Sequence, residues 1–203
     1  MTSSSRAEVA RVAAAILRDK RATTIVDAIR VAAERAGCSP QAIAVSDVRQ
    51  HLRAMALESL GDVGYGRHVA EVLTKAEEVM TLLSTLSGEP STALVGRAAR
   101  RDIDGDPTCR VRVWTDETIG EIAALVVAAG YNEPAFATIE SRFGRLSQLV
   151  FADDNVELRV TRCPVAAGVP RDLDFKTGQR VASLTLDSLR QVIADLQMPP
   201  SLQ

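Results

Sequence analysis

The chain has 203 residues, of which 46% are hydrophobic and only 3% are aromatic. This apolar content is enough for a packed core, which must be built mainly from Ala, Val, Leu and Ile. The 24 basic and 26 acidic residues nearly cancel, which excludes binding to nucleic acid or anionic membranes through the charge of the whole chain. Only a local basic patch could serve that purpose.

The N-terminal segment and the cysteines indicate the compartment. An apolar run near the N-terminus is interrupted by Arg11 and followed by further basic residues, so it lacks the continuous apolar core of a secretory signal. No segment approaches the roughly 18 to 20 apolar residues needed to span a bilayer. Cys38, Cys109 and Cys163 are odd in number and have no metal-ligand spacing, which fits a reducing compartment. We therefore expect a cytoplasmic protein without a membrane partner.

Residues 6–86 show helical periodicity almost throughout. Their apolar residues recur three and four apart, which is the spacing of one helix face. Glycine and proline at 37–40, and glycines at 61–66, stand where one helix should end and the next begin. The sequence therefore predicts a helical bundle, and a domain boundary that places this bundle in residues 1–87.

A loop signal at Ser87-Gly88-Glu89-Pro90 introduces a second half in which the apolar period shortens towards two, the period of strands. The sequence also predicts two helices in this half. One is a capped helix that ends at Gly130, and the other is a final helix that begins at Ser183 and is stopped by Pro199. The predicted strands are 92–96, 109–114 and the two halves of a hairpin over 146–163 that turns at Asp153-Asp154-Asn155. The expected class is α+β (or α/β), with a second domain over residues 88–203.

The stretch Ala93-Leu94-Val95-Gly96-Arg97-Ala98-Ala99-Arg100 resembles the opening of polymerase-β-type nucleotidyltransferases, a strand that ends in glycine and continues into a basic turn. In that family the second strand carries Asp-x-Asp, and a third strand supplies another carboxylate. Strand 109–114 stands where the second is expected, and VELRV resembles the third, with Glu157 in the carboxylate position. The resemblance implies a nucleotidyltransferase-like mixed sheet with flanking helices.

The whole chain is also similar to a bacterial family that has a helical N-terminal region and a degenerate nucleotidyltransferase-like domain. No activity is assigned to that family, so this similarity implies an architecture without a substrate. The similar stretches are residues 8–15, AIRVAAERAG, AEEVMTLL, LVGRAARRD and the Arg-Val-Trp-Thr-Asp segment.

The metal-binding aspartates of the nucleotidyltransferases are replaced here. Laying the family's usual spacing from Gly96 puts the pair on Thr108 and Arg110, and neither side chain is the hard anionic ligand that a divalent ion requires. Strand alternation puts Arg110 and Glu157 on polar faces. We therefore predict an Arg110–Glu157 ion pair in place of the metal, no resident cofactor, and a pseudoenzyme that binds a nucleotide, a phosphate or a macromolecular partner.

Arginines concentrate on the second and third predicted strands and the turn before them. Guanidinium groups that converge in a cleft would bind a nucleotide or the phosphates of a nucleic acid through bidentate contacts, whereas a solvated, ion-paired face needs no ligand. The predicted phosphate-binding residues are Gly96, Arg97, Arg100, Arg110, Arg112 and Arg159.

Two alternative functions stay open. The acidic run 101–106 contains Asp-x-Asp twice, so an active Mg-dependent nucleotidyltransferase could use Glu157 with Asp104 or Asp106, although the Gly-Asp-Pro sequence there favours a turn. The helical half could instead bind a protein partner or form oligomers without any ligand. DNA binding is not expected, because the helices around 25–57 lack a basic recognition helix.

Overall fold

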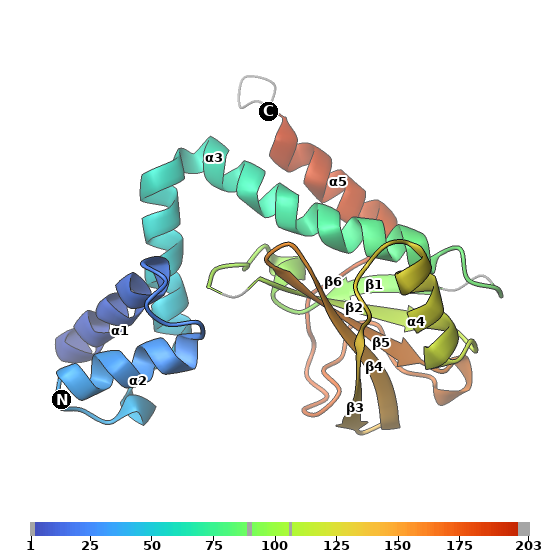
Figure 1. Ribbon diagram of the computed structural model, residues 1–203, viewed down its shortest axis with the longest axis horizontal. Coiled ribbons are helices and arrows are strands. Elements are labelled where there is room, and N and C mark those ends of the chain that lie inside the picture. The colour runs from blue at the N-terminus through green and yellow to red at the C-terminus, as the bar shows by residue number, and fades with distance from the viewer. Residues whose placement is uncertain (1–2, 89–90, 106, 199–203) are drawn as a thin grey trace. The chain divides into compact units, whose positions relative to one another are not determined.

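A computed structural model describes residues 3–88, 91–105 and 107–198 of the chain (Figure 1). The chain forms two compact units. The helical unit is Met1–Tyr65 with Asp104–Asp106, and the sheet unit is Gly66–Ile103 with Pro107–Gln203. The domain boundary predicted at residue 87 stays a prediction.

The helical unit contains α1 (Ser3–Arg18), α2 (Ile25–Arg35), a short 3-10 helix (Pro40–Ala42) and the first part of α3 (Val45–Leu83). The predicted helical periodicity is confirmed. Gly61 interrupts α3 with φ 66° and ψ 171°, a conformation that glycine adopts at little cost because it has no Cβ. The helical conformation is broken at this residue.

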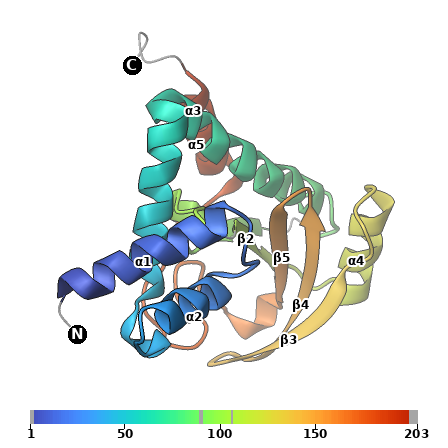
Figure 2. The same ribbon diagram turned by 60° about the vertical axis from the view of Figure 1, so that its left-hand side comes forward.

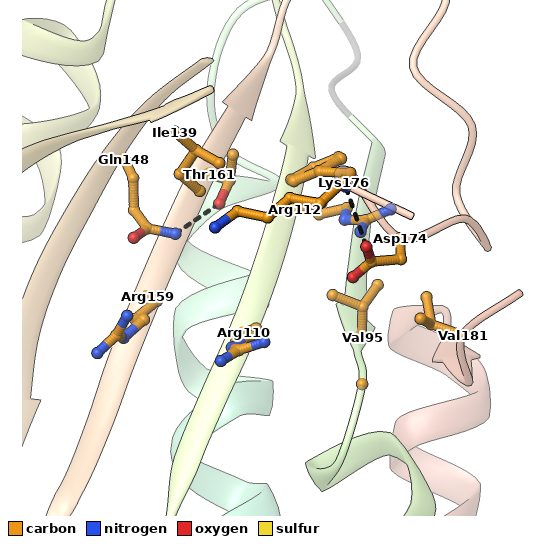
Figure 3. Close-up of a pocket in the computed structure, with 12 residues that line it drawn as sticks. Val95, Arg110, Arg112, Ile139, Gln148, Arg159, Thr161, Asp174, Lys176 and Val181 are labelled. Carbon is orange, nitrogen blue, oxygen red and sulfur yellow. Dashed lines mark hydrogen bonds between the residues drawn. The ribbon is translucent and has the colours of Figure 1, made fainter. Parts of the chain in front are cut away.

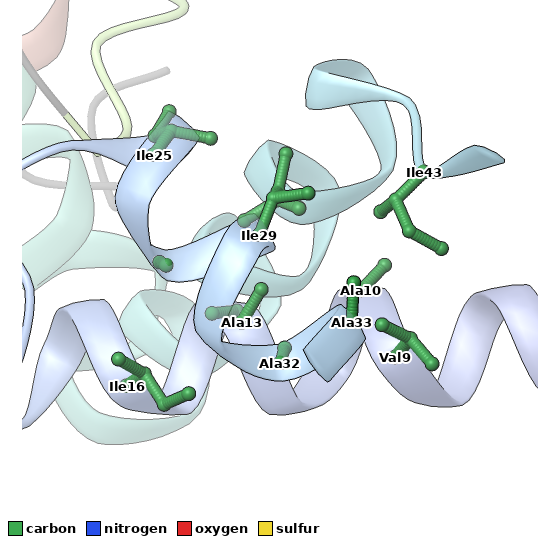
Figure 4. Close-up of a cluster of buried hydrophobic side chains, with 12 residues drawn as sticks. Val9, Ala10, Ala13, Ile16, Ile25, Ile29, Ala32, Ala33 and Ile43 are labelled. Atoms are coloured by element: carbon green, nitrogen blue, oxygen red, sulfur yellow. The ribbon is translucent and has the colours of Figure 1, made fainter. Parts of the chain in front are cut away.

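The core of the helical unit is rich in alanine, as its low aromatic content requires. Small side chains let α1 and α2 approach closely, and Figure 4 shows the two helices with Ala13 and Ala32 between them. The buried residues of this cluster are Val9, Ala10, Ala13, Ala14, Ile16, Ile25, Ala28, Ile29, Ala32, Ala33, Ile43 and Val48.

The sheet unit is built on six strands in the order β3-β4-β5-β2-β1-β6, and Figure 2 shows β2, β5, β4 and β3 following one another across the sheet. All neighbours are antiparallel except β2 and β5, which are parallel. The fold is therefore α+β with a mixed sheet. The strands are β1 (Ser91–Val95), β2 (Thr108–Trp114), β3 (Ala135–Ser141), β4 (Gly144–Asp153), β5 (Val156–Cys163) and β6 (Ser183–Leu184).

Helices of the sheet unit cover one face of the sheet. These are the part of α3 from residue 66, α4 (Ile119–Ala128) and α5 (Leu186–Gln197), and Figure 1 shows α3 and α5 side by side. The predicted alternation is confirmed on this face, because Cys109, Val111 and Val113 are at most 1% exposed. The polar side chains of β2 therefore point to the opposite face.

Two details of the C-terminal region differ from the prediction. The last helix begins at Leu186 rather than near Ser183, because Ser183–Leu184 pair with β1 as a short strand. Pro199, predicted to stop this helix, lies outside the described residues. Within the described residues, no helix is both long and apolar enough to cross a membrane.

Candidate functional site

A pocket of about 320 Å³ lies on the polar face of the sheet (Figure 3). Its size falls near the lower end of the roughly 300 to 1,000 Å³ typical of small-molecule sites. Its walls come from β1 to β5 and from the connection 164–182 between β5 and β6, which we name the strap. The lining residues are Val95, Gly96, Arg110, Arg112, Ile139, Gln148, Arg159, Thr161, Asp174, Phe175, Lys176 and Val181.

Two arginines stand side by side at one end of the pocket. Arg110 on β2 is the register partner of Arg159 on the parallel strand β5, and Figure 3 shows both side chains on adjacent strands. Arg159 donates from Nε to Oε1 of Glu157 at 2.7 Å. Arg110 is exposed, and no carboxylate of the described chain forms an ion pair with it. This end of the pocket is therefore positively charged.

The predicted Arg110–Glu157 ion pair is wrong, because the register places other residues together. Thr108 is the partner of Glu157 across β2 and β5, and its hydroxyl donates to Oε1 of Glu157 at 3.3 Å. Residues two apart on one strand share a face, so Arg159 reaches Glu157 from the same strand, while Arg110 lies two residues beyond Thr108 on β2.

The buried guanidinium of Arg112 forms the inner wall of the pocket. Arg112 is 4% exposed and donates from Nη1 to the carbonyl oxygens of Pro170 (3.1 Å) and Arg171 (3.3 Å). Its Cζ lies 3.8 Å from the ring centroid of Phe175, in cation-π geometry. No carboxylate among the described residues pairs with it, and its Nε is buried without a hydrogen-bond partner.

Burial and several neighbouring charges act on the pKa of Arg112. Burial lowers the pKa of its guanidinium, and the neighbouring charge of Arg110 lowers it further, while Cys163, Asp174 and Asp172 raise it. An arginine still stays protonated in proteins. A buried cation without a paired anion is costly, so an anion bound in the pocket would stabilise this arrangement.

Neutral and acidic groups line the other side of the pocket. Gln148 donates from Nε2 to Oγ1 of Thr161 at 2.9 Å, and both residues are buried. On the strap, Oδ1 of Asp174 accepts from the backbone N–H groups of Lys176 (3.0 Å) and Thr177 (2.8 Å). The backbone hydrogen bond from Thr177 is the largest of the effects that lower the pKa of Asp174, so this carboxyl is ionised at neutral pH.

The pocket brings together only part of the predicted phosphate-binding set. Arg97 donates from Nε and Nη2 to the carboxylate of Asp102 at 3.0 and 3.2 Å, and Arg100 is exposed in the 3-10 helix Ala98–Arg100. Neither lines the pocket. The predicted residues that do line it are Gly96, Arg110, Arg112 and Arg159.

The carboxylates of the alternative metal site fall in different units or outside the described residues, so that site stays a prediction. Asp104 belongs to the helical unit, where Tyr65 donates its hydroxyl to Oδ2 of Asp104 at 2.8 Å, and Asp106 lies outside the described residues. Glu157 belongs to the sheet unit. Among the residues that the structure describes, no group of three or more His, Cys, Asp or Glu side chains could hold a metal ion.

The position at which the predicted resemblance would put a metal site does not suit a divalent cation. Glu157 supplies a carboxylate there, and that carboxylate is paired with Arg159. Arg110 lies two residue pairs away along the same two strands. A hard cation prefers several oxygen ligands, and two guanidinium groups would repel it.

The sequence alone does not identify several residues of the pocket. Thr161 carries a signal because it shares the alternating polar face of strand 156–163 with Glu157 and Arg159. Gln148 is a polar residue within the mainly apolar stretch 146–151, and buried polar residues are informative. Asp174, Phe175 and Lys176 lie on the strap, which has no regular period. Only the folded structure places them at the pocket.

Comparison with models of protein families gives no match to this chain, and comparison with curated proteins gives none either. The geometry and charge of the pocket therefore carry the functional interpretation.

Proposed function

We propose that the sheet unit binds the phosphate group of a nucleotide or another small molecule in this pocket, and that arginines rather than a metal ion supply the positive charge. The observation that carries the proposal is the buried guanidinium of Arg112, which forms no ion pair with a carboxylate of the described residues. Arg110 and Arg159 reinforce it from adjacent strands. Guanidinium groups bind phosphate oxygens through two parallel hydrogen bonds.

The balance of charge in the pocket favours an anion. Its lining contains the basic residues Arg110, Arg112, Arg159 and Lys176, against the acidic residue Asp174. Like charges this close destabilise the folded state when nothing compensates them. A bound phosphate would relieve that repulsion, so ligand binding and fold stability are linked.

The resemblance to nucleotidyltransferases points in the same direction. We propose that the sheet unit is a catalytically degenerate domain of that kind, in which β2 carries Thr108 and Arg110 in place of the aspartates. The parallel pairing of β2 with β5, which brings Glu157 next to Thr108, supports this relation. We also place the protein in the cytoplasm, where its free cysteines, Cys38, Cys109 and Cys163, would stay reduced.

The proposal is tested by thermal unfolding of the full chain with pyrophosphate and with each NTP, in the presence and absence of Mg²⁺. A ligand at 100 times its Kd stabilises a protein by about 2.7 kcal/mol. We expect pyrophosphate or a nucleotide to raise the Tm by several degrees without Mg²⁺. Stabilisation that requires Mg²⁺ would support an active enzyme instead, and no stabilisation by any of these ligands would refute the proposal.

A variant pair locates the binding. Arg110→Ala removes an exposed pocket arginine that has no ion pair in the described chain, so the fold should tolerate this substitution. The variant should lose most of the ligand-induced Tm shift. Arg145→Ala is the matched control, because Arg145 pairs with Glu140 outside the pocket. The control should keep the full Tm shift. Equal losses in both variants would indicate nonspecific binding to surface charge.

A further inference from the structure

The strap holds acidic and basic groups over the pocket at defined positions. Arg112 binds its backbone at Pro170 and Arg171, and Trp114 donates from Nε1 to the carbonyl oxygen of Val169 at 2.7 Å. A third anchor is the backbone N–H of Arg142, which donates to the carbonyl oxygen of Phe175 at 3.0 Å. The strap is therefore tied down before the turn that carries Asp174 and within it.

The turn itself fixes the orientation of Asp174. Its backbone pairs with Gln179 (2.7 Å) and Gly178 (3.0 Å), and its Oδ1 accepts two backbone hydrogen bonds and one from the Thr177 hydroxyl at 3.0 Å. Oδ2 accepts no hydrogen bond from the described residues. Figure 3 shows the carboxylate directed from the strap into the pocket, so Oδ2 presents an open acceptor there.

Gln148 presents a second open acceptor from β4. Its Nε2 is used by Thr161, which leaves Oε1 without a hydrogen-bond donor among the described residues. The pocket thus combines a cationic end at Arg110 and Arg159 with acceptor groups at Gln148 and Asp174. The hydrogen-bond acceptors Gln148 and Asp174 need a donor from the ligand. The phosphate group bound at the arginines has almost only acceptor oxygens, so another part of the ligand must supply that donor.

We infer that Asp174 selects phosphate esters that carry hydroxyl groups, such as sugar phosphates or nucleotides, over phosphate itself and over esters without hydroxyls. The inference rests on the proposed phosphate binding. The phosphate lies among Arg110, Arg112 and Arg159, and a hydroxyl of the ligand donates to Oδ2 of Asp174. The volume of about 320 Å³ suits such a molecule, because sites of roughly 300 Å³ and more hold whole small molecules.

A rival role for Asp174 is that of a counter-charge for Arg112. Asp172, on the same strap, acts electrostatically on Arg112 as Asp174 does, but Asp172 does not line the pocket and its nearest ion pair is Arg180 at 3.9 Å. Asp172→Asn therefore removes a counter-charge without removing the pocket acceptor. Asp174→Asn removes the charge and keeps an oxygen for the turn, which makes the two variants a matched pair.

The test is isothermal titration calorimetry of the full chain with ribose 5-phosphate, butyl phosphate and inorganic phosphate. We expect ribose 5-phosphate to bind at least about tenfold more tightly than butyl phosphate, the factor that corresponds to one hydrogen bond to a charged group. Asp174→Asn should remove most of that preference, whereas Asp172→Asn should keep it. The comparison of ligands on the unaltered protein needs no variant, so it holds even if Asp174→Asn does not fold.

The outcomes separate the two proposals. Equal affinity of the unaltered protein for ribose 5-phosphate and butyl phosphate would overturn the role of Asp174 and leave phosphate binding intact. A uniform change for all three ligands in both strap variants would assign Asp174 the counter-charge role, which also overturns the inference. Absence of binding by all three ligands would overturn the proposed function itself.

Discussion

Arg110 on β2 and Arg159 on β5 are register partners on neighbouring parallel strands, and both line the same pocket. Adjacent strands lie about 4.8 Å apart, so the two positive charges stand at directly paired positions of neighbouring strands. Glu157 neutralises Arg159 from the same strand. Arg110 has no such partner in the described chain. This pair of positions therefore keeps a net positive charge that can bind an anion.

Removing the counter-charge of Arg159 should strengthen phosphate binding. We expect Glu157→Gln to raise the affinity for pyrophosphate several-fold, because Arg159 is then free to bind the ligand. The pair is partly exposed, so the free energy of unfolding without ligand should fall by less than about 1 kcal/mol. Calorimetry and urea denaturation measure the two effects. Glu140→Gln is the control. If Glu157→Gln instead loses binding only in the presence of Mg²⁺, Glu157 is a metal ligand.

Truncation of Arg112 should loosen the strap. Arg112→Ala leaves the carbonyl oxygens of Pro170 and Arg171 without their donor and uncovers the ring of Phe175. We expect a loss of roughly 2 to 4 kcal/mol in the free energy of unfolding. Limited proteolysis with trypsin should then cut faster within 171–180, where exposed basic residues lie. Unchanged cleavage of this segment would show that the other anchors hold the strap alone.

The parts of the fold that were predictable depend on neighbours in sequence. The helix α4 begins at the capping box of Thr118 and Glu121 and is followed by Gly130 at φ 94°, and both signals are local. The hairpin turns between Asp153 and Val156, as its turn residues predict. Alternation along β2 assigned the buried and polar faces correctly, because a strand's period is fixed by its backbone.

The missed features depend on contacts between distant residues. The partner of Glu157 follows from the register of β2 against β5, which no local pattern encodes. Strand β3 was not predicted, because it lies at the sheet edge and most of its residues are exposed, so it lacks an apolar alternation. The strap is irregular, and its place over the pocket depends on Arg112 and Trp114.

A side chain at Gly105 should cost more stability than one at Gly37. A Cβ at this position would lie 2.8 Å from Cδ1 of Ile25 and 3.1 Å from Cδ1 of Leu52, and its φ is +93°. We expect Gly105→Ala to destabilise the helical unit by about 1 kcal/mol from backbone strain, plus the smaller cost of displacing the ends of the Ile25 and Leu52 side chains. Gly37→Ala is the matched control, with φ +62° and open space around the new Cβ. Thermal unfolding followed by circular dichroism should show the larger loss for Gly105→Ala.

Two cysteines should be inert in the folded protein. Cys109 and Cys163 are fully buried, and burial raises the pKa of each thiol from 9.0 to about 12. The reactive form of cysteine is the thiolate. At about pH 8 a thiol reagent should therefore modify only the partly exposed Cys38 rapidly, and all three cysteines after denaturation. Rapid modification of Cys109 or Cys163 in the native state would contradict their burial.

The same thiols predict how stability depends on pH. In the unfolded chain they ionise near their ordinary pKa of 9.0, whereas in the fold they stay protonated up to about 12. The unfolded state then binds fewer protons, so the free energy of unfolding falls as pH rises between these values. Urea denaturation across this range should show the decline, and Cys109→Ala should make it less steep. An identical slope in the variant would mean that Cys109 does not contribute to it.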